Sequence, residues 1–142
     1  MGVTLESKNF SIDMGYIGFN RLRTKVAHLV EKELGEHYEA LDRDVPFMKE
    51  EERKQFFVGY NKKIAEIQEK FKIPDAVLEF LYAPDSDGKI TYGRCKKIYE
   101  VIKDYDDNIA YGYCGRSDCA MFKDFKNIVK DCIENKCSMK WF

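Results

Sequence analysis

Apolar residues recur at steps of three and four positions along most of the chain, which is the spacing of a helix that buries one face. The first run begins near Gly15 and consists of Phe19, Leu22, Val26, Leu29, Val30, Leu34, Tyr38 and Leu41. Because this spacing continues over many turns, it predicts one long first helix. Asp13 stands just before the run and is the candidate N-cap.

A second helical run follows Pro46 and predicts a second long helix. Its apolar positions are Phe57, Tyr60, Ile64, Ile67 and Phe71. Charged residues occupy most of its other positions, which indicates a solvated face. Pro74 suits the first turn of a helix, so we expect a short third helix after it. The buried edge of that helix is expected at Val77, Leu78, Leu81 and Tyr82.

Two more helices are predicted in the last third of the chain. Thr91 is the candidate N-cap of the fourth, whose apolar positions are Cys95, Ile98, Tyr99, Ile102 and Tyr105. Residues 106–117 have the composition of a loop, with more aromatic residues than a linker usually carries. Ser117 or Asp118 then caps a fifth helix, which buries Phe122, Phe125, Val129, Cys132 and Ile133.

Strand signals are short. Residues 3–12 alternate loosely and predict one strand or a small hairpin around Ser7, Lys8 and Asn9. Residues 89–91 are expected to be briefly extended, and no repeat or domain boundary interrupts the pattern. The sequence therefore predicts a mainly α fold, a compact bundle of about five helices with at most a small β element, in a single helical domain over residues 1–142.

Composition narrows the classes of partner. Hydrophobic residues make up 44% of the chain and aromatic residues 14%, a balance typical of a globular protein. With 24 basic and 25 acidic side chains, the net charge of −1 creates no overall field that attracts nucleic acid or an anionic membrane. No segment resembles a signal peptide or a membrane span. We therefore expect a cytoplasmic protein with no nucleic-acid or membrane partner.

The cysteines are five in number and confined to the last third of the chain, which fits free thiols in a reducing compartment. Cys114 and Cys119, and likewise Cys132 and Cys137, are spaced more widely than the usual ligand pairs of a zinc site. On the predicted fifth helix, Cys119 and Cys132 would lie about 20 Å apart. We therefore expect buried small residues and a few exposed thiols, and no zinc site.

Residues 84–90 resemble the middle of a calcium-binding loop, in which closely spaced carboxylates precede a glycine and an aliphatic residue. If Asp85 and Asp87 occupy the third and fifth loop positions, Ala83 is first and Arg94 is twelfth. The first carboxylate and the bidentate glutamate are then missing. An Asp-Gly turn between two helices is the favoured interpretation. No cofactor is assigned, and Asp85 and Asp87 remain the candidates for calcium or another divalent cation.

No catalytic motif stands out in the sequence. His28 and His37 both fall in the predicted first helix without a nucleophile motif beside them, so they are expected at the surface or hydrogen-bonded in the core. The common phosphate-loop, dinucleotide, zinc-protease and nucleophile-elbow motifs do not occur. No catalytic residue is assigned. An enzyme that uses Asp85 and Asp87 with a divalent cation is the alternative hypothesis.

The start of the first helix carries the clearest polar pattern. Tyr16, Asn20 and Arg23 are spaced at i, i+4 and i+7, so they share a face beside the apolar stripe. A phenol, an amide and a guanidinium at the margin of a core can recognise a planar or anionic group. The aromatic loop adds three candidates for binding a ligand or partner, which are Tyr111, Tyr113 and Arg116.

Three segments, GYIGFNRLRTKVA, LEFLYAPDSDGKITYGRCKKIYEVI and DCAMFKDFKNIVKDC, resemble those of a family of small uncharacterised proteins from bacteria and their prophages. The similarity covers most of the chain. It implies a stand-alone accessory protein encoded by a mobile element, and it assigns no catalytic residue.

These patterns favour a noncatalytic binding protein that engages a protein partner or sequesters a small ligand. The chain offers aromatic and arginine anchors, but the sequence shows no assembled acid, base and nucleophile. A cavity with convergent polar groups would favour a small ligand, and a flat aromatic patch would favour a protein partner.

Overall fold

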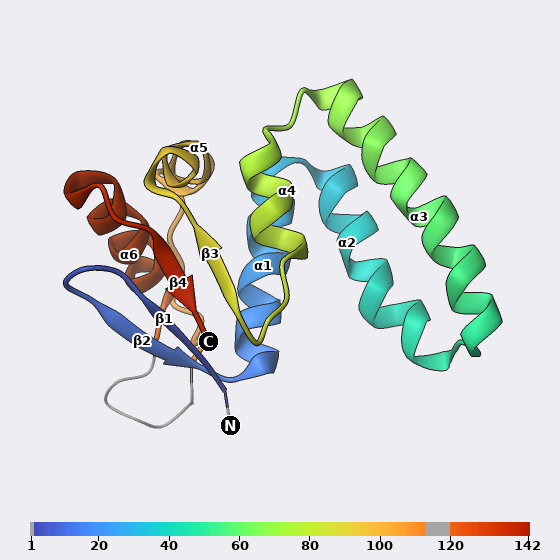
Figure 1. Cartoon of the computed structure of the whole chain (residues 1–142), viewed down its shortest axis with the longest axis horizontal. Coiled ribbons are helices and arrows are strands. Elements are labelled where there is room, and N and C mark those ends of the chain that lie inside the picture. Colours follow the sequence, from blue (N-terminus) through green and yellow to red (C-terminus); the bar gives the residue numbers. More distant parts are fainter. Residues whose placement is uncertain (1, 113–119) are drawn as a thin grey trace. The chain divides into compact units, whose positions relative to one another are not determined.

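The structure is a computed structural model that describes residues 2–112 and 120–142. Within them the elements are β1 (Val3–Glu6), β2 (Ser11–Met14), α1 (Tyr16–Val30), α2 (Lys32–Asp44), η1 (Val45–Phe47), α3 (Glu50–Phe71), α4 (Asp75–Tyr82), β3 (Gly88–Ile90), α5 (Tyr92–Ile102), α6 (Phe122–Asn135) and β4 (Met139–Trp141) (Figure 1). The fold is mainly α with a small antiparallel sheet, as predicted. None of the described helices has both the length and the apolar composition of a bilayer span.

The chain divides into two compact units. The first comprises residues 1–23 and 75–142 and contains the sheet, the first turns of α1, and α4, α5 and α6. The second comprises residues 24–74 and contains the rest of α1, α2, η1 and α3. We call them the sheet unit and the helical unit.

The sheet has the strand order β2-β1-β4-β3, and all neighbouring strands are antiparallel. β1 and β2 form the predicted hairpin, in which Val3 lies opposite Met14. The strand β3 overlaps the residues expected to be extended. The sequence analysis did not predict β4, which lies between β1 and β3 and joins them into one sheet.

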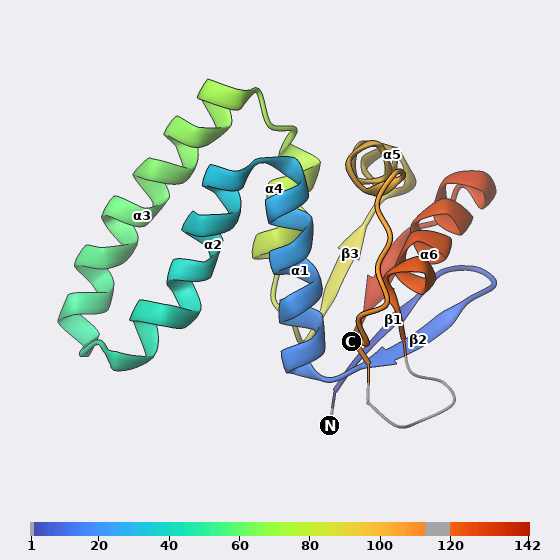
Figure 2. The same cartoon turned by 180° about the vertical axis from the view of Figure 1, so that it is seen from behind.

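One face of the sheet is buried and the other is open to solvent. Alternate residues of a strand point to the same face, and the buried set is Val3, Leu5, Met14, Ile90, Met139 and Trp141. The helices α5 and α6 lie on the side of the sheet turned toward the viewer in Figure 2. Lys89 and Lys140 alternate with buried neighbours and are exposed on the opposite face.

Trp141 is central to the aromatic core of the sheet unit. Its ring centroid lies 5.7 Å from that of Phe19 and 5.9 Å from that of Phe80. Its indole Nε1 donates a hydrogen bond to the carbonyl oxygen of Pro84 at 2.8 Å. A side chain at Gly88 would overlap the indole, so the strand opposite Trp141 requires a glycine there.

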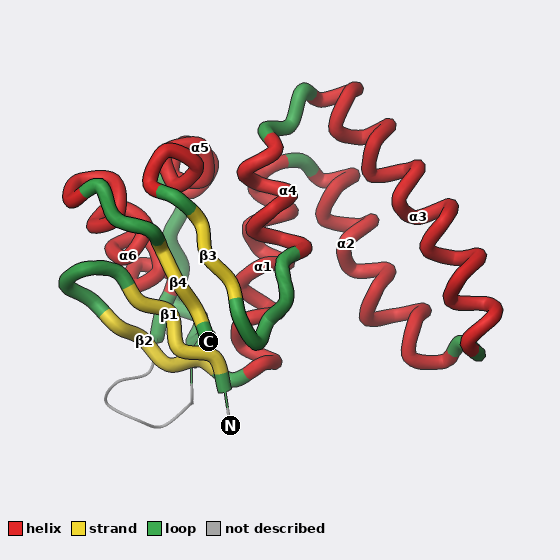
Figure 3. Tube along the Cα trace, viewed as in Figure 1, coloured by secondary structure: helices red, strands yellow, loops and turns green. Residues whose placement is uncertain are grey.

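The predicted long first helix is wrong, because the chain forms two helices in that region. Between α1 and α2, Glu31 is extended, with φ −163° and ψ 138° (Figure 3). The imidazole of His28 lies against Gly35, in the space that any side chain at this position would need. The glycine therefore allows α1 and α2 to approach each other closely at the turn. Both helices keep the same apolar spacing, so periodicity alone did not reveal the break.

Asp13 is not a helix N-cap, since it lies in β2. Its carboxylate accepts a hydrogen bond from Thr4 Oγ1 at 2.7 Å across the hairpin. The Asp13 carboxylate is therefore bonded to Thr4 on the neighbouring strand, whereas an N-cap would accept a hydrogen bond from the first turn of the helix. The helix itself begins at Tyr16, close to the predicted start.

The helical unit is held by contacts between α2 and α3. The rings of His37 and Tyr60 stack with centroids 3.8 Å apart, and His37 Nε2 donates to the Tyr60 carbonyl oxygen at 3.0 Å. Lys70 pairs with Glu33 at 3.2 Å. Within α3, Tyr60 and Ile67 are buried, whereas Phe57 on the same predicted stripe is 37% exposed. The stripe is thus only partly covered.

α4 and α5 begin close to their predicted positions, whereas α6 begins at Phe122, later than predicted. α4 follows Pro74, and α5 follows Thr91, although the Thr91 side chain makes no capping hydrogen bond. At the start of α6, Asp124 Oδ2 accepts a hydrogen bond from the Met121 backbone N–H at 2.8 Å. The predicted caps Ser117 and Asp118 lie outside the described residues.

Candidate functional site

A pocket of about 310 Å³ opens on the sheet unit, where the β1–β2 hairpin approaches the segment between α6 and β4. Three lysines dominate its lining, which consists of Glu6, Ser7, Lys8, Lys89, Cys137, Ser138 and Lys140. We call this site the lysine pocket. Its residues come from three separate parts of the chain, so the fold and not a local motif creates it.

Asp131 on α6 fixes the hairpin side of the lysine pocket. This side chain is buried, and its carboxylate accepts hydrogen bonds from Ser7 Oγ at 2.6 Å and from the backbone N–H and side-chain amide of Asn9 at 2.8 Å each. Asn135 Nδ2 donates a further hydrogen bond at 2.7 Å. Burial alone would raise the pKa of Asp131, but these hydrogen bonds outweigh burial and lower it below the ordinary value. The ionised carboxylate therefore holds the turn that carries Lys8 against α6.

The strand register places two of the lysines directly opposite each other. Lys89 on β3 faces Lys140 on β4, and Glu6 on β1 faces Lys140 from the other side. Like charges opposite one another across strands destabilise a sheet. With Lys8 included, three lysines against one glutamate leave an excess of two positive charges in the lining. This local excess contrasts with the net charge of −1 on the whole chain.

This arrangement suits an anionic group. Lysine ammonium groups attract negative charge, and the hydroxyl of Ser138 can donate a hydrogen bond to it. A bound phosphate or carboxylate would also offset the repulsion between Lys89 and Lys140. Among the described residues that line the pocket there is no histidine, the side chain that exchanges a proton near neutral pH. The geometry therefore supports binding better than acid–base catalysis.

Cys137 contributes the nucleophilic atom of the lysine pocket. The side chain is half-buried, and burial raises its pKa above the ordinary 9.0. A hydrogen bond from the Lys8 backbone N–H to the sulfur opposes this effect and lowers the pKa. Because burial is the larger effect, Cys137 is a protonated thiol at neutral pH.

The three residues predicted to form a binding face lie on α1 but differ in exposure. Tyr16 is 40% exposed and Asn20 is half-buried, whereas Arg23 is 5% exposed. The guanidinium carbon of Arg23 lies 4.3 Å from the centroid of the Phe19 ring. Two other core rings, those of Phe80 and Trp141, are within 5.7 Å and 5.6 Å of it. Arg23 therefore makes cation–π contacts inside the sheet unit, which leaves Tyr16 and Asn20 as the accessible members of the face.

Tyr111 lies beside α1 but is buried. Arg21 of α1 is 6.0 Å from its ring centroid. Its hydroxyl and that of Tyr105 each donate a hydrogen bond to Asp107 Oδ2 at 2.7 Å. Burial and then the hydrogen bond to Asp107 raise the pKa of Tyr105 to about 12, and the same causes raise that of Tyr111. Both phenols therefore stay protonated and hold the segment between Tyr105 and Tyr111 through Asp107. The other two loop candidates, Tyr113 and Arg116, lie outside the described residues.

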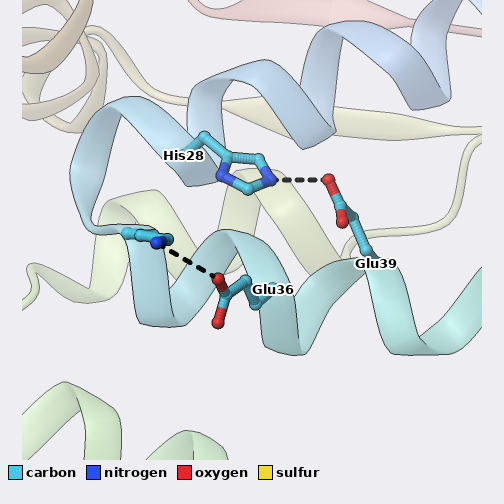
Figure 4. A network of polar contacts seen from close by, with 4 residues as sticks. His28, Glu36 and Glu39 are labelled. Carbon is cyan, nitrogen blue, oxygen red and sulfur yellow. Dashed lines mark hydrogen bonds and ion pairs between the residues drawn. The ribbon is translucent and has the colours of Figure 1, made fainter.

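The two histidines both have hydrogen-bond partners. His28 Nε2 lies 2.6 Å from Glu39 Oε1, and the Lys32–Glu36 ion pair lies nearby with its charged atoms 3.8 Å apart (Figure 4). His37 is used in the stack with Tyr60 described above. These contacts join successive helices of the helical unit, so the geometry gives both side chains a structural use.

Asp85 and Asp87 are exposed in the connection between α4 and β3. Arg94, at the position where a calcium loop has its bidentate glutamate, instead pairs with Glu79 of α4. In the part of the chain that the structure describes, no group of three or more His, Cys, Asp or Glu side chains is placed to hold a metal ion. Cys114 and Cys119 lie outside that part.

Sequence reasoning missed the lysine pocket. Its local signal is the placement of Lys140 between the apolar residues Met139 and Trp141, which is the alternation of a half-buried strand. That pattern is too short to show that Lys140 pairs with Lys89, fifty-one positions earlier in the chain. Only the strand order brings these charges together.

Comparison with protein-family models, with curated proteins and with solved structures finds no match for this chain.

Proposed function

We propose that this protein is a noncatalytic binding protein whose lysine pocket receives an anionic group, either on a small ligand or on an acidic segment of a protein partner. One observation carries the proposal, namely the pairing of Lys89 with Lys140 across adjacent strands. Such a pair costs sheet stability unless a negative group lies between the two charges. Glu6, opposite Lys140 on the far side from Lys89, offsets only part of the positive charge.

The scaffold around the lysine pocket supports the proposal. The three hydrogen bonds from Ser7 and Asn9 to Asp131 fix the hairpin turn before any ligand arrives. A preorganised site loses less conformational entropy on binding than a mobile one. Ser138 adds a hydroxyl group beside the lysines, so a phosphate or carboxylate would find both charge and a hydrogen-bond donor.

The proposed ligand is one anionic group and not a nucleic-acid strand. Nucleic-acid binding relies on many lysine and arginine contacts that follow the phosphate backbone. Three lysines around one pocket, on a chain with a net charge of −1, can neutralise only one or two negative charges. A pocket of this charge suits a stand-alone cytoplasmic accessory protein that recognises a single acidic group.

The test is isothermal titration calorimetry of the whole chain with two probes, inorganic phosphate and a short peptide rich in Asp and Glu. Binding of phosphate and peptide would indicate recognition of the anionic group itself, and binding of the peptide alone would indicate a protein partner. We expect Lys89→Gln and Lys140→Gln each to weaken binding by about 1 kcal/mol, roughly fivefold.

The matched control is Lys62→Gln, which removes an exposed lysine of α3. It should leave the affinity unchanged. If both probes fail to bind, or if Lys62→Gln weakens binding as much as Lys140→Gln does, the pocket is not an anion site.

A further inference from the structure

The sheet unit also contains a chain of three thiols that anion binding does not use. It begins with Cys132 and Cys137, which straddle the end of α6. Lys136 between them has left-handed φ and ψ of 52° and 42°. The backbone N–H groups of Lys136 and Cys137 both donate to the Cys132 carbonyl oxygen, the latter at 3.0 Å. This helix ending normally brings the side chains at these two positions into contact.

The three thiols lie in series, each near enough to the next to influence its pKa. Cys137 contacts Cys132 through their side chains, and Cys132 contacts Cys95 of α5 in the same way. Cys95 and Cys132 are fully buried, and Cys95 Sγ also lies 3.8 Å from the Ile90 carbonyl oxygen. Cys137 is half-buried and lines the lysine pocket. The series therefore runs from an accessible thiol to two protected thiols.

We propose that Cys137 and Cys132 form a redox-active pair that closes to a disulfide in the presence of hydrogen peroxide, with Cys137 as the thiol that the peroxide oxidises and Cys132 as the resolving thiol. The proposal does not depend on anion binding. All three cysteines are free thiols in this structure. The hydrogen bond of 3.0 Å from the Cys137 backbone N–H to the Cys132 carbonyl oxygen holds the two backbones close together, and this helix ending favours contact between the two side chains.

The reaction has two steps. The thiolate of Cys137 attacks one peroxide oxygen, the O–O bond breaks, and Cys137 becomes a sulfenic acid while the other oxygen leaves as water after protonation. The Cys132 sulfur then attacks the Cys137 sulfur and displaces the hydroxyl group, which leaves as a second water. Two thiols are oxidised, and one peroxide is reduced to two waters. The Lys8 backbone N–H that donates to Cys137 Sγ stabilises the attacking thiolate.

The rate has a defined pH dependence. Burial raises the pKa of Cys137, so only a small thiolate fraction exists at neutral pH. We expect the oxidation rate to rise about tenfold per pH unit until the pH reaches that pKa, because the thiolate is the nucleophile. The pair is therefore a slow sensor near neutral pH and a faster one in alkaline solution.

The experiment uses the whole chain with Cys114→Ser and Cys119→Ser, which removes the two thiols outside the described residues. After treatment with hydrogen peroxide, we expect the intact mass to fall by two hydrogen atoms and to recover with dithiothreitol. Trypsin cleaves after Lys130, Lys136 and Lys140, so the disulfide would join two otherwise separate peptides. The peptides DCIENK and CSMK should therefore appear as one cross-linked product.

A second variant tests whether Cys137 is the cysteine that peroxide oxidises first. With Cys132→Ala added, the dimedone probe for sulfenic acid should label Cys137, and circular dichroism should confirm that the variant is folded. If Cys132→Ala does not fold, the peptide map of the parent still decides. The proposal is overturned if the three thiols stay reduced while glutathione in the same tube is oxidised, or if the disulfide joins Cys95 to Cys132.

Discussion

The sheet unit buries a cluster of large aromatic side chains, whereas every phenylalanine of the helical unit is at least partly exposed. In the sheet unit, Trp141, Phe19 and Phe80 are fully buried in one aromatic cluster. In the helical unit, Phe47 is 86% exposed and Val58 is 74% exposed. A densely packed interior can hold polar groups in fixed positions, as it holds Asp131. The comparison explains why the lysine pocket is built on the sheet unit.

The largest difference should appear when core side chains are truncated. We expect Trp141→Ala to lower the free energy of unfolding by about 3 to 5 kcal/mol, because it opens a cavity and leaves the Pro84 carbonyl without its indole donor. Val58→Ala on exposed α3 should change it by less than about 0.5 kcal/mol. Urea denaturation of the two variants gives both numbers. Equal losses would show that the burial contrast has no energetic meaning.

The next largest effect concerns the carboxylate that holds the hairpin. Asp131→Ala should cost about 2 to 4 kcal/mol, since Ser7 and Asn9 lose a buried charged acceptor. The lowered pKa of Asp131 also sets the pH dependence. Its contribution is complete above the ordinary value of 3.8 and is lost as pH falls through the lower folded-state pKa.

Denaturation of wild type and Asp131→Asn across the acid range measures this contribution. The wild-type curve should fall more steeply with acid than that of the variant, which has no carboxylate to protonate. Parallel curves would contradict the assigned pKa shift.

The helical unit should respond to pH in a different window. Burial lowers the pKa of His37 from 6.5, the hydrogen bond to the Tyr60 carbonyl partly opposes this, and Lys63 lowers it further. The unfolded chain therefore takes up the proton first as pH falls below 6.5, and stability decreases until native His37 is protonated as well. His37→Phe keeps a ring for the stack with Tyr60 and should remove this dependence. Denaturation midpoints of the wild type and of His37→Phe, measured above and below pH 6.5, test this prediction.

The smallest expected effect concerns the paired lysines. Lys89→Glu replaces a repulsive pair with an attractive one, so the sheet should gain about 0.2 to 1 kcal/mol. The same change should abolish phosphate binding, because it puts a carboxylate where the anion is expected. Opposite signs for stability and binding would separate a functional charge from a structural one. A decrease in the free energy of unfolding would contradict the inference that Lys89 and Lys140 repel each other across the strands.

Much of the fold follows from the sequence. The apolar spacing around Tyr60 and Ile67 predicts α3, and the position of Pro74 predicts the start of α4. These signals are local, because a helix makes its hydrogen bonds within its own segment. The break at Glu31 escaped the same reasoning, since the residues on both sides keep one periodicity.

The site could not be predicted in the same way. β4 is three residues long and depends on partners far away in the chain, so no window of the sequence contains its signal. Arg23 illustrates the reverse case. Helical spacing correctly puts it on the same helix as Tyr16 and Asn20, but only the packing of Phe80 and Trp141 shows that its guanidinium is covered.

The central claim is that the lysine pocket, and not the accessible part of the α1 face, receives an anionic group. Two-dimensional NMR of the labelled chain during a titration with inorganic phosphate at low ionic strength tests this directly. We predict saturable chemical-shift changes of the backbone amides of Lys8, Ser138 and Lys140. In Lys89→Gln, these changes should require a higher phosphate concentration. Shifts centred on Tyr16 and Asn20, or none at all, would contradict the account.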